Sequence, residues 1–375
     1  MAGLYLHVPF CQQKCHYCDF FSAPPLGDQL TSWHQLLERN LHLIAQEYRP
    51  LLETVFFGGG TPSLLTPSQI ATILSSCQKL FPVSSGAEIS LEANPGTLTV
   101  TNLKGYLSAG INRLSIGVQS FDDETLDLLG RRHNAAEARQ IFIQARSLGF
   151  TNISLDLIFA LPGQSLAALD RELEQLLELS PEHVGIYGLS IEPGTHLAKL
   201  INKGQLRETT DEAYAEAYLH LHRRLTAEGY DHYEISNFAR PGYRCRHNQG
   251  YWQRKPCLAA GAGAHGFNPT GYGQRNAIPN DLLRYQQKLD AGENPAELLE
   301  EFDQQLAMVE TLYLGLRTSD GVDRTDFAQK FGSFPEVAFP AAFHSLGSKL
   351  HLEKNRYFFN PEEWLLYDHL ISHFL

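Results

Sequence analysis

Three cysteines near the start of the chain are spaced so that one loop can hold them around a single metal centre. Cys11, Cys15 and Cys18 form a C-x3-C-x2-C pattern directly after the apolar segment LYLHV. Three thiolates suit an iron–sulfur cluster that leaves one iron open to another ligand, because such clusters are held by cysteine sulfur. Structural zinc takes four protein ligands, so a zinc site would need His7 or His16 as the fourth. The spacing alone leaves both alternatives open.

The other three cysteines are scattered through the chain. Cys77, Cys245 and Cys257 have no partner nearby in the sequence, and six cysteines in 375 residues are too few for a disulfide scaffold. We expect these three to be buried small residues. The loop that holds the clustered cysteines is polar, so chance burial explains its thiols less well than metal binding does.

Glycine and polar residues gather where apolar segments are expected to end. Gly58–Gly60 and Thr61 follow one such segment, and consecutive glycines let a ligand approach the backbone closely. Ligands in parallel α/β folds bind at the carboxyl ends of strands, so polar residues there are candidates for one shared site. Taken singly, each of them is equally well explained as a cap or a solvated side chain. The candidates in or after the next three segments are Glu92, Gln119, Arg131 and Asp156.

The elements that must position these residues alternate between strand and helix in the first half of the chain. Apolar, β-prone segments are separated there by amphipathic helical segments. This alternation predicts a parallel sheet that is either doubly wound or curled into a barrel, and periodicity does not choose between the two. The expected strands begin near Leu4, Thr54, Glu88, Arg113, Asn152 and His183.

The pattern changes after about residue 230. We expect a core domain over residues 1–230, a loop-rich bridging segment over 231–298 that is rich in glycine and aromatic residues, and a small helical or winged-helix-like domain over 299–375. The elements expected in this last domain are helices over 302–316 and 324–331, a hairpin over 350–359 and a final helix from Pro361.

Composition limits the class of protein. Hydrophobic residues make up 43% of the chain and charged residues 19%, which supplies enough apolar material for a packed core. The formal net charge of -12 has the wrong sign for general capture of phosphate backbones, so no nucleic-acid partner is expected. No apolar run reaches the roughly 20 residues that span a bilayer, and the first residues lack the pattern of a signal peptide. A cytoplasmic protein is expected.

The segment YLHVPFCQQKCHYCDF resembles the signature of the radical S-adenosylmethionine (SAM) superfamily. The resemblance implies that Cys11, Cys15 and Cys18 bind a [4Fe-4S] cluster, that SAM chelates the fourth iron, and that the reduced cluster releases a 5′-deoxyadenosyl radical from SAM. It also implies an α/β fold, a partial (β/α)6 TIM-like barrel followed by the small C-terminal helical or winged-helix-like domain. The SAM contacts that it implies are Tyr5, Tyr17, Gly59, Gly60, Thr61, Glu92, Gln119, Arg131 and Asp156.

Over nearly the whole chain the sequence resembles the oxygen-independent coproporphyrinogen III oxidase group. True oxidases of that group carry a fourth cysteine two positions after the third, where this chain has Phe20. They also carry an extension ahead of the first strand, whereas this strand is expected to begin within four residues of Met1. Both departures match the haem-chaperone subgroup of the family. The chain also has the H-N-x-x-Y-W motif of that subgroup, in RHNQGYW.

The motif consists of His247, Asn248, Tyr251 and Trp252. Resemblance to the subgroup implies binding of haem, its delivery to haem proteins of the respiratory chain, a homodimer, and peripheral contact with the inner face of the membrane. His247 is the candidate axial ligand, since imidazole coordinates haem iron and aromatic faces pack against a porphyrin. A hydrogen-bonded loop or core edge is the plain alternative. Basic residues that either attract haem propionates or are simply solvated are Arg244, Arg246, Arg254 and Lys255.

Two enzyme functions stand beside the chaperone, and the sequence does not decide whether the chain is an enzyme. One is oxidative decarboxylation of coproporphyrinogen III by the SAM radical, and the other, radical modification of tRNA, fits the acidic charge poorly. A nicotinamide site is not expected. Gly261, Gly263 and Gly266 satisfy G-x-G-x-x-G, but turn-forming residues follow them where a dinucleotide-binding fold needs a helix.

Overall fold

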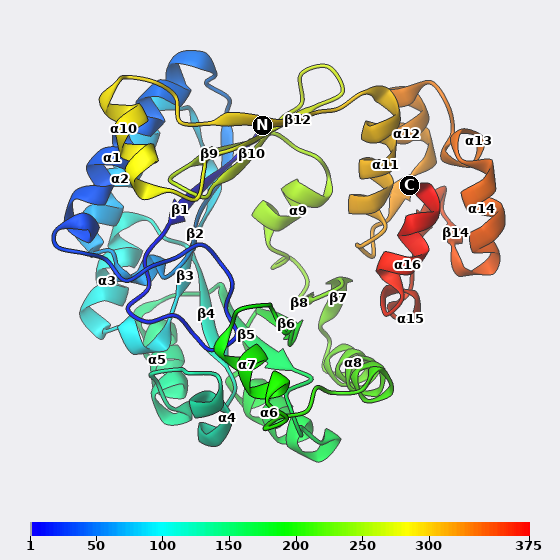
Figure 1. The fold of residues 1–375 in the computed structure, drawn as a ribbon, viewed down its shortest axis with the longest axis horizontal. Coiled ribbons are helices and arrows are strands. Elements are labelled where there is room, and N and C mark those ends of the chain that lie inside the picture. The colour runs from blue at the N-terminus through cyan, green and yellow to red at the C-terminus, as the bar shows by residue number, and fades with distance from the viewer. Residues whose placement is uncertain (1) are drawn as a thin grey trace.

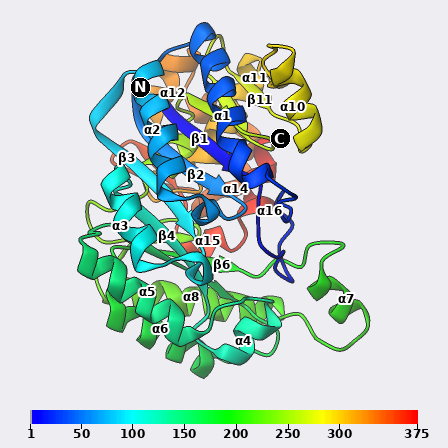
Figure 2. The same ribbon diagram turned by 90° about the vertical axis from the view of Figure 1, so that its left-hand side faces the viewer.

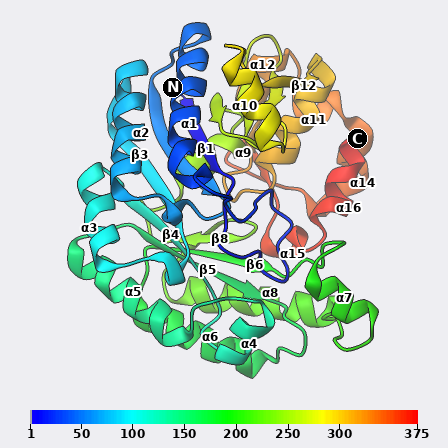
Figure 3. The same ribbon diagram turned by 60° about the vertical axis from the view of Figure 1, so that its left-hand side comes forward.

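The computed structural model describes residues 2–375 and shows an α/β fold built on one mixed sheet of 12 strands (Figure 1). The six parallel strands at its centre are β1 (Ala2–Val8), β2 (Leu52–Gly59), β3 (Val83–Ala93), β4 (Arg113–Gln119), β5 (Ile153–Phe159) and β6 (His183–Gly188). They lie side by side in chain order, as βαβ connections favour. Helices cover the outer face of the curved sheet (Figure 3). The fold is therefore the partial (β/α)6 barrel that the family resemblance implies, and the choice that periodicity left open is decided for the barrel.

The helices between these strands bury one apolar face on the sheet. In α6 (Leu166–Leu179), Leu169, Leu173 and Leu176 are buried at helical spacing. Thr66 caps α2 (Pro67–Leu80) in a reciprocal pair of hydrogen bonds with Gln69. The other helices of this half are α1 (Gln29–Glu47), α3 (Val100–Ala109), α4 (Asp123–Leu128), α5 (Ala135–Leu148), α7 (His196–Asn202) and α8 (Asp211–Ala227).

Residues 231–298, expected to form a loop-rich bridge, instead extend the central sheet at both edges. Their elements are β7 (Asp231–Glu234), β8 (Asn237–Ala239), α9 (Arg246–Trp252), β9 (Cys257–Ala260), β10 (His265–Asn268), β11 (Gln274–Ala277), α10 (Leu282–Asp290) and β12 (Glu297–Glu301). β8 pairs antiparallel with β6, while β9 runs parallel to β1. Strands this short carry no readable alternation, and they form because the edges of the parallel sheet offer free backbone groups.

Of the glycines of GAGAHG, Gly261 and Gly263 lie in the turn between β9 and β10, and Gly266 lies in β10. Gly261 has φ of +96°, and a Cβ there would lie 2.4 Å from the backbone oxygen of His7. A larger residue at this position would therefore collide with the end of β1. Close backbone packing explains the motif, and no helix follows it to bind a dinucleotide phosphate.

The C-terminal residues form a separate group of helices around a small sheet. Its elements are α11 (Gln304–Gly315), β13 (Val322–Asp323), α12 (Arg324–Phe331), α13 (Pro335–Ala338), α14 (Pro340–Leu346), β14 (His351–Glu353), β15 (Arg356–Phe358), α15 (Pro361–Trp364) and α16 (Tyr367–Ile371). The strands pair antiparallel in the order β13-β15-β14. In Figure 1 this group lies at the right, and α9 lies between it and the barrel.

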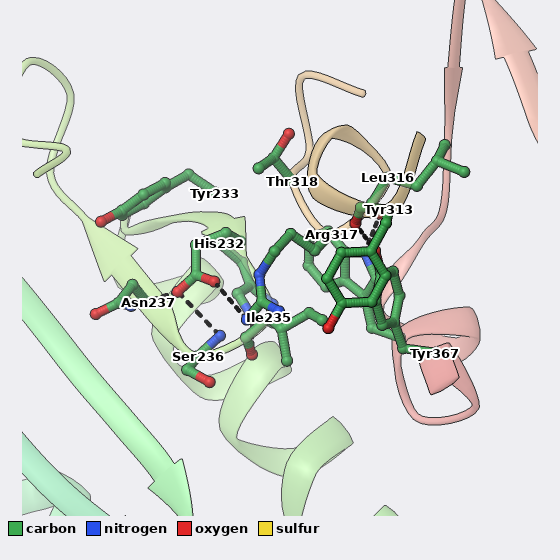
Figure 4. A network of polar contacts seen from close by, with 12 residues as sticks. His232, Tyr233, Ile235, Ser236, Asn237, Tyr313, Leu316, Arg317, Thr318 and Tyr367 are labelled. Carbon is green, nitrogen blue, oxygen red and sulfur yellow. Dashed lines mark hydrogen bonds and ion pairs between the residues drawn. The ribbon is translucent and has the colours of Figure 1, made fainter. Parts of the chain in front are cut away.

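A buried polar network joins the C-terminal group to β7 and β8 (Figure 4). Arg317, which follows α11, donates to Glu234 Oε2 at 3.4 Å. The guanidinium of Arg317 also lies 4.2 Å from the ring centre of Trp252. Glu234 also accepts the amide of Ser236 at 3.2 Å and the side-chain amide of Asn237. The buried carboxylate is thus paired and hydrogen-bonded, which a buried charge requires. Through Trp252, Arg317 also connects the C-terminal group to the end of α9.

The loop around α7 projects away from the barrel (Figure 2).

Among residues 2–375, no helix has the combination of length and apolar character that crossing a membrane requires.

Candidate functional site

A cavity of about 700 Å³ opens at the carboxyl ends of the parallel strands. It is lined by the cysteine loop and by side chains from the ends of β2 to β6, which are far apart in the sequence. This is the edge at which parallel α/β folds bind ligands. Of the predicted site residues, those that line the cavity are Cys11, Cys15, Cys18, Tyr17, Gly59, Gly60, Thr61, Glu92, Gln119, Arg131 and Asp156. Two predicted residues do not line it, Tyr5 and His247.

The three clustered thiols are half-buried, and two of them accept hydrogen bonds from across the cavity. Thr61 Oγ1 donates to Cys11 Sγ at 3.3 Å, and Arg131 Nη1 donates to Cys15 Sγ at 3.3 Å. Such donors stabilise thiolate sulfur, the form that binds metal. Within residues 2–375, no three potential ligands converge on one point as a single metal ion would need. An iron–sulfur cluster bonds each cysteine to a different iron, so these side chains fit a cluster better than one ion.

The zinc alternative relies on His7 or His16 as the fourth ligand, and the structure places both away from this cavity. Burial lowers the pKa of His7, and its ring nitrogens lie 3.2 Å from Tyr5 Oη and 3.1 Å from the backbone oxygen of Phe21. His16 Nδ1 bonds the backbone oxygen of Leu128 at 2.9 Å. Neither histidine lines the cavity. Three sulfur ligands without a histidine favour the cluster.

The glycine run is required by the close approach of β1 and the cysteine loop. A Cβ on Gly60 would lie 2.5 Å from the backbone oxygen of Phe10. Gly59 has φ of +109°, and its amide donates to Glu92 Oε2 at 3.1 Å. The backbone therefore reaches the cavity without side chains, leaving space for a ligand.

Two half-buried carboxyls face the cavity from β3 and β5. Burial raises the pKa of Glu92 to about 7, and the charge of Asp156 adds to the shift. Burial also raises the pKa of Asp156, against the opposing effect of hydrogen bonds from Ser115 and Ser154. Ser115 Oγ donates to Asp156 Oδ2 at 2.9 Å. Carboxylates in such a setting can accept hydroxyl or ammonium donors from a ligand.

Gln119 and Arg131 complete the polar wall. Gln119 has φ of +69°, a left-handed conformation that is uncommon outside glycine and is often found at functional sites. Arg131 is held by the backbone oxygen of Gly117, to which its Nη2 donates at 2.6 Å. A guanidinium fixed in this way can pair with a ligand carboxylate.

Comparison with known proteins assigns the family. Residues 5–179 match the family model of the Radical SAM superfamily. The chain is 35% identical over 382 residues to "Heme chaperone HemW" of Bacillus subtilis, and the match covers 100% of this chain and 99% of that protein. The chain belongs to the HemW family of radical SAM proteins. A second HemW, from Synechocystis sp., is 37% identical over 86% of this chain and 79% of its own length.

The fold has a solved counterpart outside the HemW family. Coproporphyrinogen III oxidase (HemN) of Escherichia coli, a radical SAM enzyme, matches with a TM-score of 0.84 over 100% of this chain and 89% of that chain. Sequence identity is 21%, so this match shows the fold alone. It confirms the α/β barrel fold with its C-terminal group over the whole chain.

The histidine of the H-N-x-x-Y-W motif lies beside Gly3 and Thr54, near the amino ends of β1 and β2, whereas the cysteine loop lies at the carboxyl ends of the strands. His247 is 3% exposed, and its Nδ1 and Nε2 lie 2.7 Å from Thr54 Oγ1 and 2.8 Å from Tyr251 Oη. Burial and the nearby Arg113 guanidinium lower the pKa of His247 to about 3. Both ring nitrogens are thus occupied within the protein. In this conformation His247 does not fit the role of a haem ligand.

Sequence reasoning did not find several polar residues of this region. Ser115 and Tyr187 line the cavity, and Ser154 and His183 lie beneath it in β5 and β6. For Ser115 and Ser154 the available signal was their position two residues before Gly117 and Asp156, on the same face of the strands. Tyr5 also points inward but below the cavity, where its ring stacks on Phe56 with centroids 6.1 Å apart.

Beyond α9 lies a second cavity, of about 950 Å³, between the barrel and the C-terminal group. Trp252 of the motif lines it, together with residues of α11, α12 and the β14–β15 hairpin. The indole nitrogen of Trp252 is buried and has no hydrogen-bond partner among the described residues. The motif therefore places one aromatic residue at this cavity and one histidine inside the barrel.

Proposed function

We propose that this chain is a haem chaperone that carries a [4Fe-4S] cluster and SAM and delivers haem to haem proteins of the respiratory chain. The observation that carries the proposal is the end-to-end similarity to a protein named heme chaperone HemW. The cavity supports the cofactor part, because three thiols and eight of the predicted SAM contacts line one space.

Within this proposal the cysteine loop holds the cluster and the strand ends hold SAM. When bound, the cluster and SAM supply one-electron chemistry that protein side chains lack. Thr61 and Arg131 donate hydrogen bonds to cysteine sulfur, while Glu92 and Asp156 offer acceptors for hydroxyl or ammonium groups. The glycine run lets a ligand lie against the backbone.

Haem binding through His247 would require a rearrangement of α9. Coordination of iron by either ring nitrogen breaks the hydrogen bond to Thr54 or the one to Tyr251. Because a buried hydroxyl without a partner costs about 1–3 kcal/mol, we expect this rearrangement to be unfavourable without haem. His247 as the haem ligand is thus a prediction about a conformation in which α9 has moved. A homodimer, peripheral membrane contact and the identity of the recipient rest on the family resemblance.

The decisive experiment is anaerobic reconstitution of the cluster followed by haem titration, with coproporphyrinogen III and SAM assayed in parallel on the same preparation. The proposal predicts saturable binding of haem and no vinyl product. Vinyl formation without stable haem binding would show an oxidase that works with Phe20 in place of a fourth cysteine. Phe20 is 72% exposed at the cavity, so Phe20→Ala is a control that should leave folding unchanged.

Delivery needs its own measurement. Haem-loaded protein is mixed with an apo-haem protein of the respiratory chain, and transfer is followed by the absorbance of the acceptor. Transfer faster than from free haem or from haem-loaded serum albumin supports a chaperone. Transfer at the rate set by simple haem dissociation would leave a haem-binding protein without a delivery function.

A further inference from the structure

A chain of buried hydrogen bonds runs beneath the cofactor cavity to the start of α9. Ser154 Oγ donates to Asp156 Oδ1 at 3.0 Å and lies 2.8 Å from His183 Nδ1. His183 Nε2 lies 2.7 Å from Tyr233 Oη, which accepts the amide of Cys245 at 3.3 Å. Cys245 is the N-cap residue of α9. The four residues below Asp156 are each no more than 1% exposed, so solvent does not compete for these bonds.

The donors and acceptors of this chain run in one direction. Ser154 has a single hydroxyl proton, which is directed at Asp156, so its oxygen must accept a hydrogen bond from His183 Nδ1–H. Burial and the Arg113 guanidinium hold the pKa of His183 well below its ordinary value. The imidazole is therefore neutral and has only this one N–H, which leaves Nε2 to accept from the hydroxyl of Tyr233.

The groups around the chain keep this direction fixed. Burial holds the pKa of Tyr233 well above its ordinary value, so the phenol retains the proton that it donates. At the other end, a second hydroxyl donates to Asp156 from Ser115. Arg113, itself 2% exposed, adds a positive charge that favours the ionised carboxylate and the neutral imidazole. Each hydrogen bond therefore determines the orientation of the next.

The end of the hydrogen-bond series that lies farthest from Asp156 contacts the first turn of α9. While Tyr233 accepts the amide of Cys245, the carboxylate of Glu88 accepts the amides of Arg246 and His247, each at 3.1 Å. The first amides of a helix have no partners within it, so their acceptors help to decide whether the helix forms in place. Two groups inside the barrel supply these acceptors here, and one of them belongs to the chain that reaches Asp156.

We propose that His183 is a positioning residue that fixes the Ser154 hydroxyl on Asp156, holds this carboxylate ready for SAM, and ties its orientation to the start of α9. The inference rests on the proposed SAM site and is independent of haem binding. Because coupling between two sites is reciprocal, SAM bound at Asp156 should stabilise the first turn of α9. Breaking this series of hydrogen bonds should weaken SAM binding without any change to a residue that contacts SAM.

The first test uses Tyr233→Phe in the cluster-reconstituted protein, with Tyr230→Phe as the matched control. Tyr230 is also buried and donates to a backbone oxygen, that of Pro181, at 2.6 Å, outside the chain. Loss of one hydrogen bond in the chain should weaken SAM binding about three- to tenfold in Tyr233→Phe and leave it unchanged in Tyr230→Phe. SAM should also slow amide hydrogen exchange over residues 244–250 in the wild type and not in Tyr233→Phe.

A second measurement tests the direction of the hydrogen bonds through the tautomer of His183. Nitrogen-15 NMR of the imidazole should show His183 as the neutral Nδ1–H tautomer in the wild type and a mixture of tautomers in Tyr233→Phe. His183→Gln, which keeps a donor and an acceptor, should bind SAM more tightly than His183→Leu. Equal SAM affinity in the two tyrosine variants, or an Nε2–H tautomer in the wild type, would overturn the inference. If the wild-type protein binds no SAM, the proposed cofactor is refuted. The tautomer of His183 would still decide the direction of the hydrogen bonds between Tyr233 and Asp156.

Discussion

The imidazole of His247 stacks on the ring of Phe56 inside the barrel, with centroids 4.9 Å apart and ring planes inclined by 22°. A Cβ on Gly3 of β1 would lie 3.1 Å from the same imidazole, so the glycine leaves the space that the ring fills. A helix outside the parallel strands thus inserts a neutral histidine into the barrel. By packing on Phe56 and beside Gly3, His247 of α9 fills space inside the barrel near the amino ends of β1 and β2, which gives this histidine a structural role.

This burial predicts a pH dependence of stability. The pKa of His247 is about 3 in the folded protein against an ordinary value of 6.5, so below pH 6.5 the proton binds the unfolded chain first. Each pH unit below 6.5 should then remove up to about 1.4 kcal/mol of stability through this group. In His247→Gln, which does not titrate, the free energy of unfolding from urea denaturation should fall less steeply between pH 6.5 and 4. The exposed His373→Gln is the control, and equal slopes in His247→Gln and wild type would contradict the assignment.

The cysteine loop makes the second prediction. Cys11→Ala, Cys15→Ala and Cys18→Ala should each lose most of the four irons and the visible absorbance of the reconstituted protein, because each thiolate is expected to hold a different iron. Cys77→Ala is the matched control, since Cys77 is 1% exposed in α2 and lies outside the cavity. Its loss should lower the free energy of unfolding and leave the iron content unchanged. Full iron content in any variant of the loop would show that its cysteine is not a ligand.

The first half of the fold could be predicted because its strands are long, apolar and separated by capped helices. The cavity could be predicted because parallel strands bring their carboxyl ends together, which placed Glu92 and Asp156 on one wall. Strands β7 to β12 could not, since their pairing is decided by the edges that they meet and little by their own residues.

Tyr5 shows a different limit of the sequence. The resemblance implied a SAM contact, and the structure turns this side chain into the barrel, where it bonds His7 and lies below the cavity. Neighbouring residues of a strand face opposite sides, but depth along the barrel is set by register with the next strands, which the sequence does not state. His183 was not among the candidates for a different reason, because an isolated histidine in a strand carries no sequence pattern.

Gly60 supplies the third prediction. A Cβ at this position would lie 2.5 Å from the backbone oxygen of Phe10, so Gly60→Ala must displace the segment that leads into the cysteine loop. We expect a loss of about 1–3 kcal/mol in the free energy of unfolding, as for other overpacked sites, together with lower iron content after reconstitution. Gly86→Ala is the control, because a Cβ there has no atom within 4 Å. Normal iron content and stability in Gly60→Ala would show that the loop tolerates displacement.

Glu92 predicts how SAM binding depends on pH. Burial, helped by the charge of Asp156, raises the pKa of Glu92 to about 7 from an ordinary value of 4.5. As pH rises from 4.5 to 7 the unfolded chain releases this proton first, so the free protein should lose stability over that range. SAM carries a positive sulfonium group and should favour the ionised carboxylate, so its binding should release the proton.

The affinity of the cluster-loaded protein for SAM, measured by equilibrium dialysis, should therefore rise about tenfold between pH 6 and pH 8. Glu92→Gln, which keeps the shape and an acceptor but does not titrate, should bind SAM with less dependence on pH and should lose less stability than the wild type from pH 4.5 to 7. The exposed Glu174→Gln on α6 should behave like the wild type. If the pH dependence of SAM binding persists unchanged in Glu92→Gln, another group at the cavity releases the proton, and Asp156 becomes the next carboxyl to substitute.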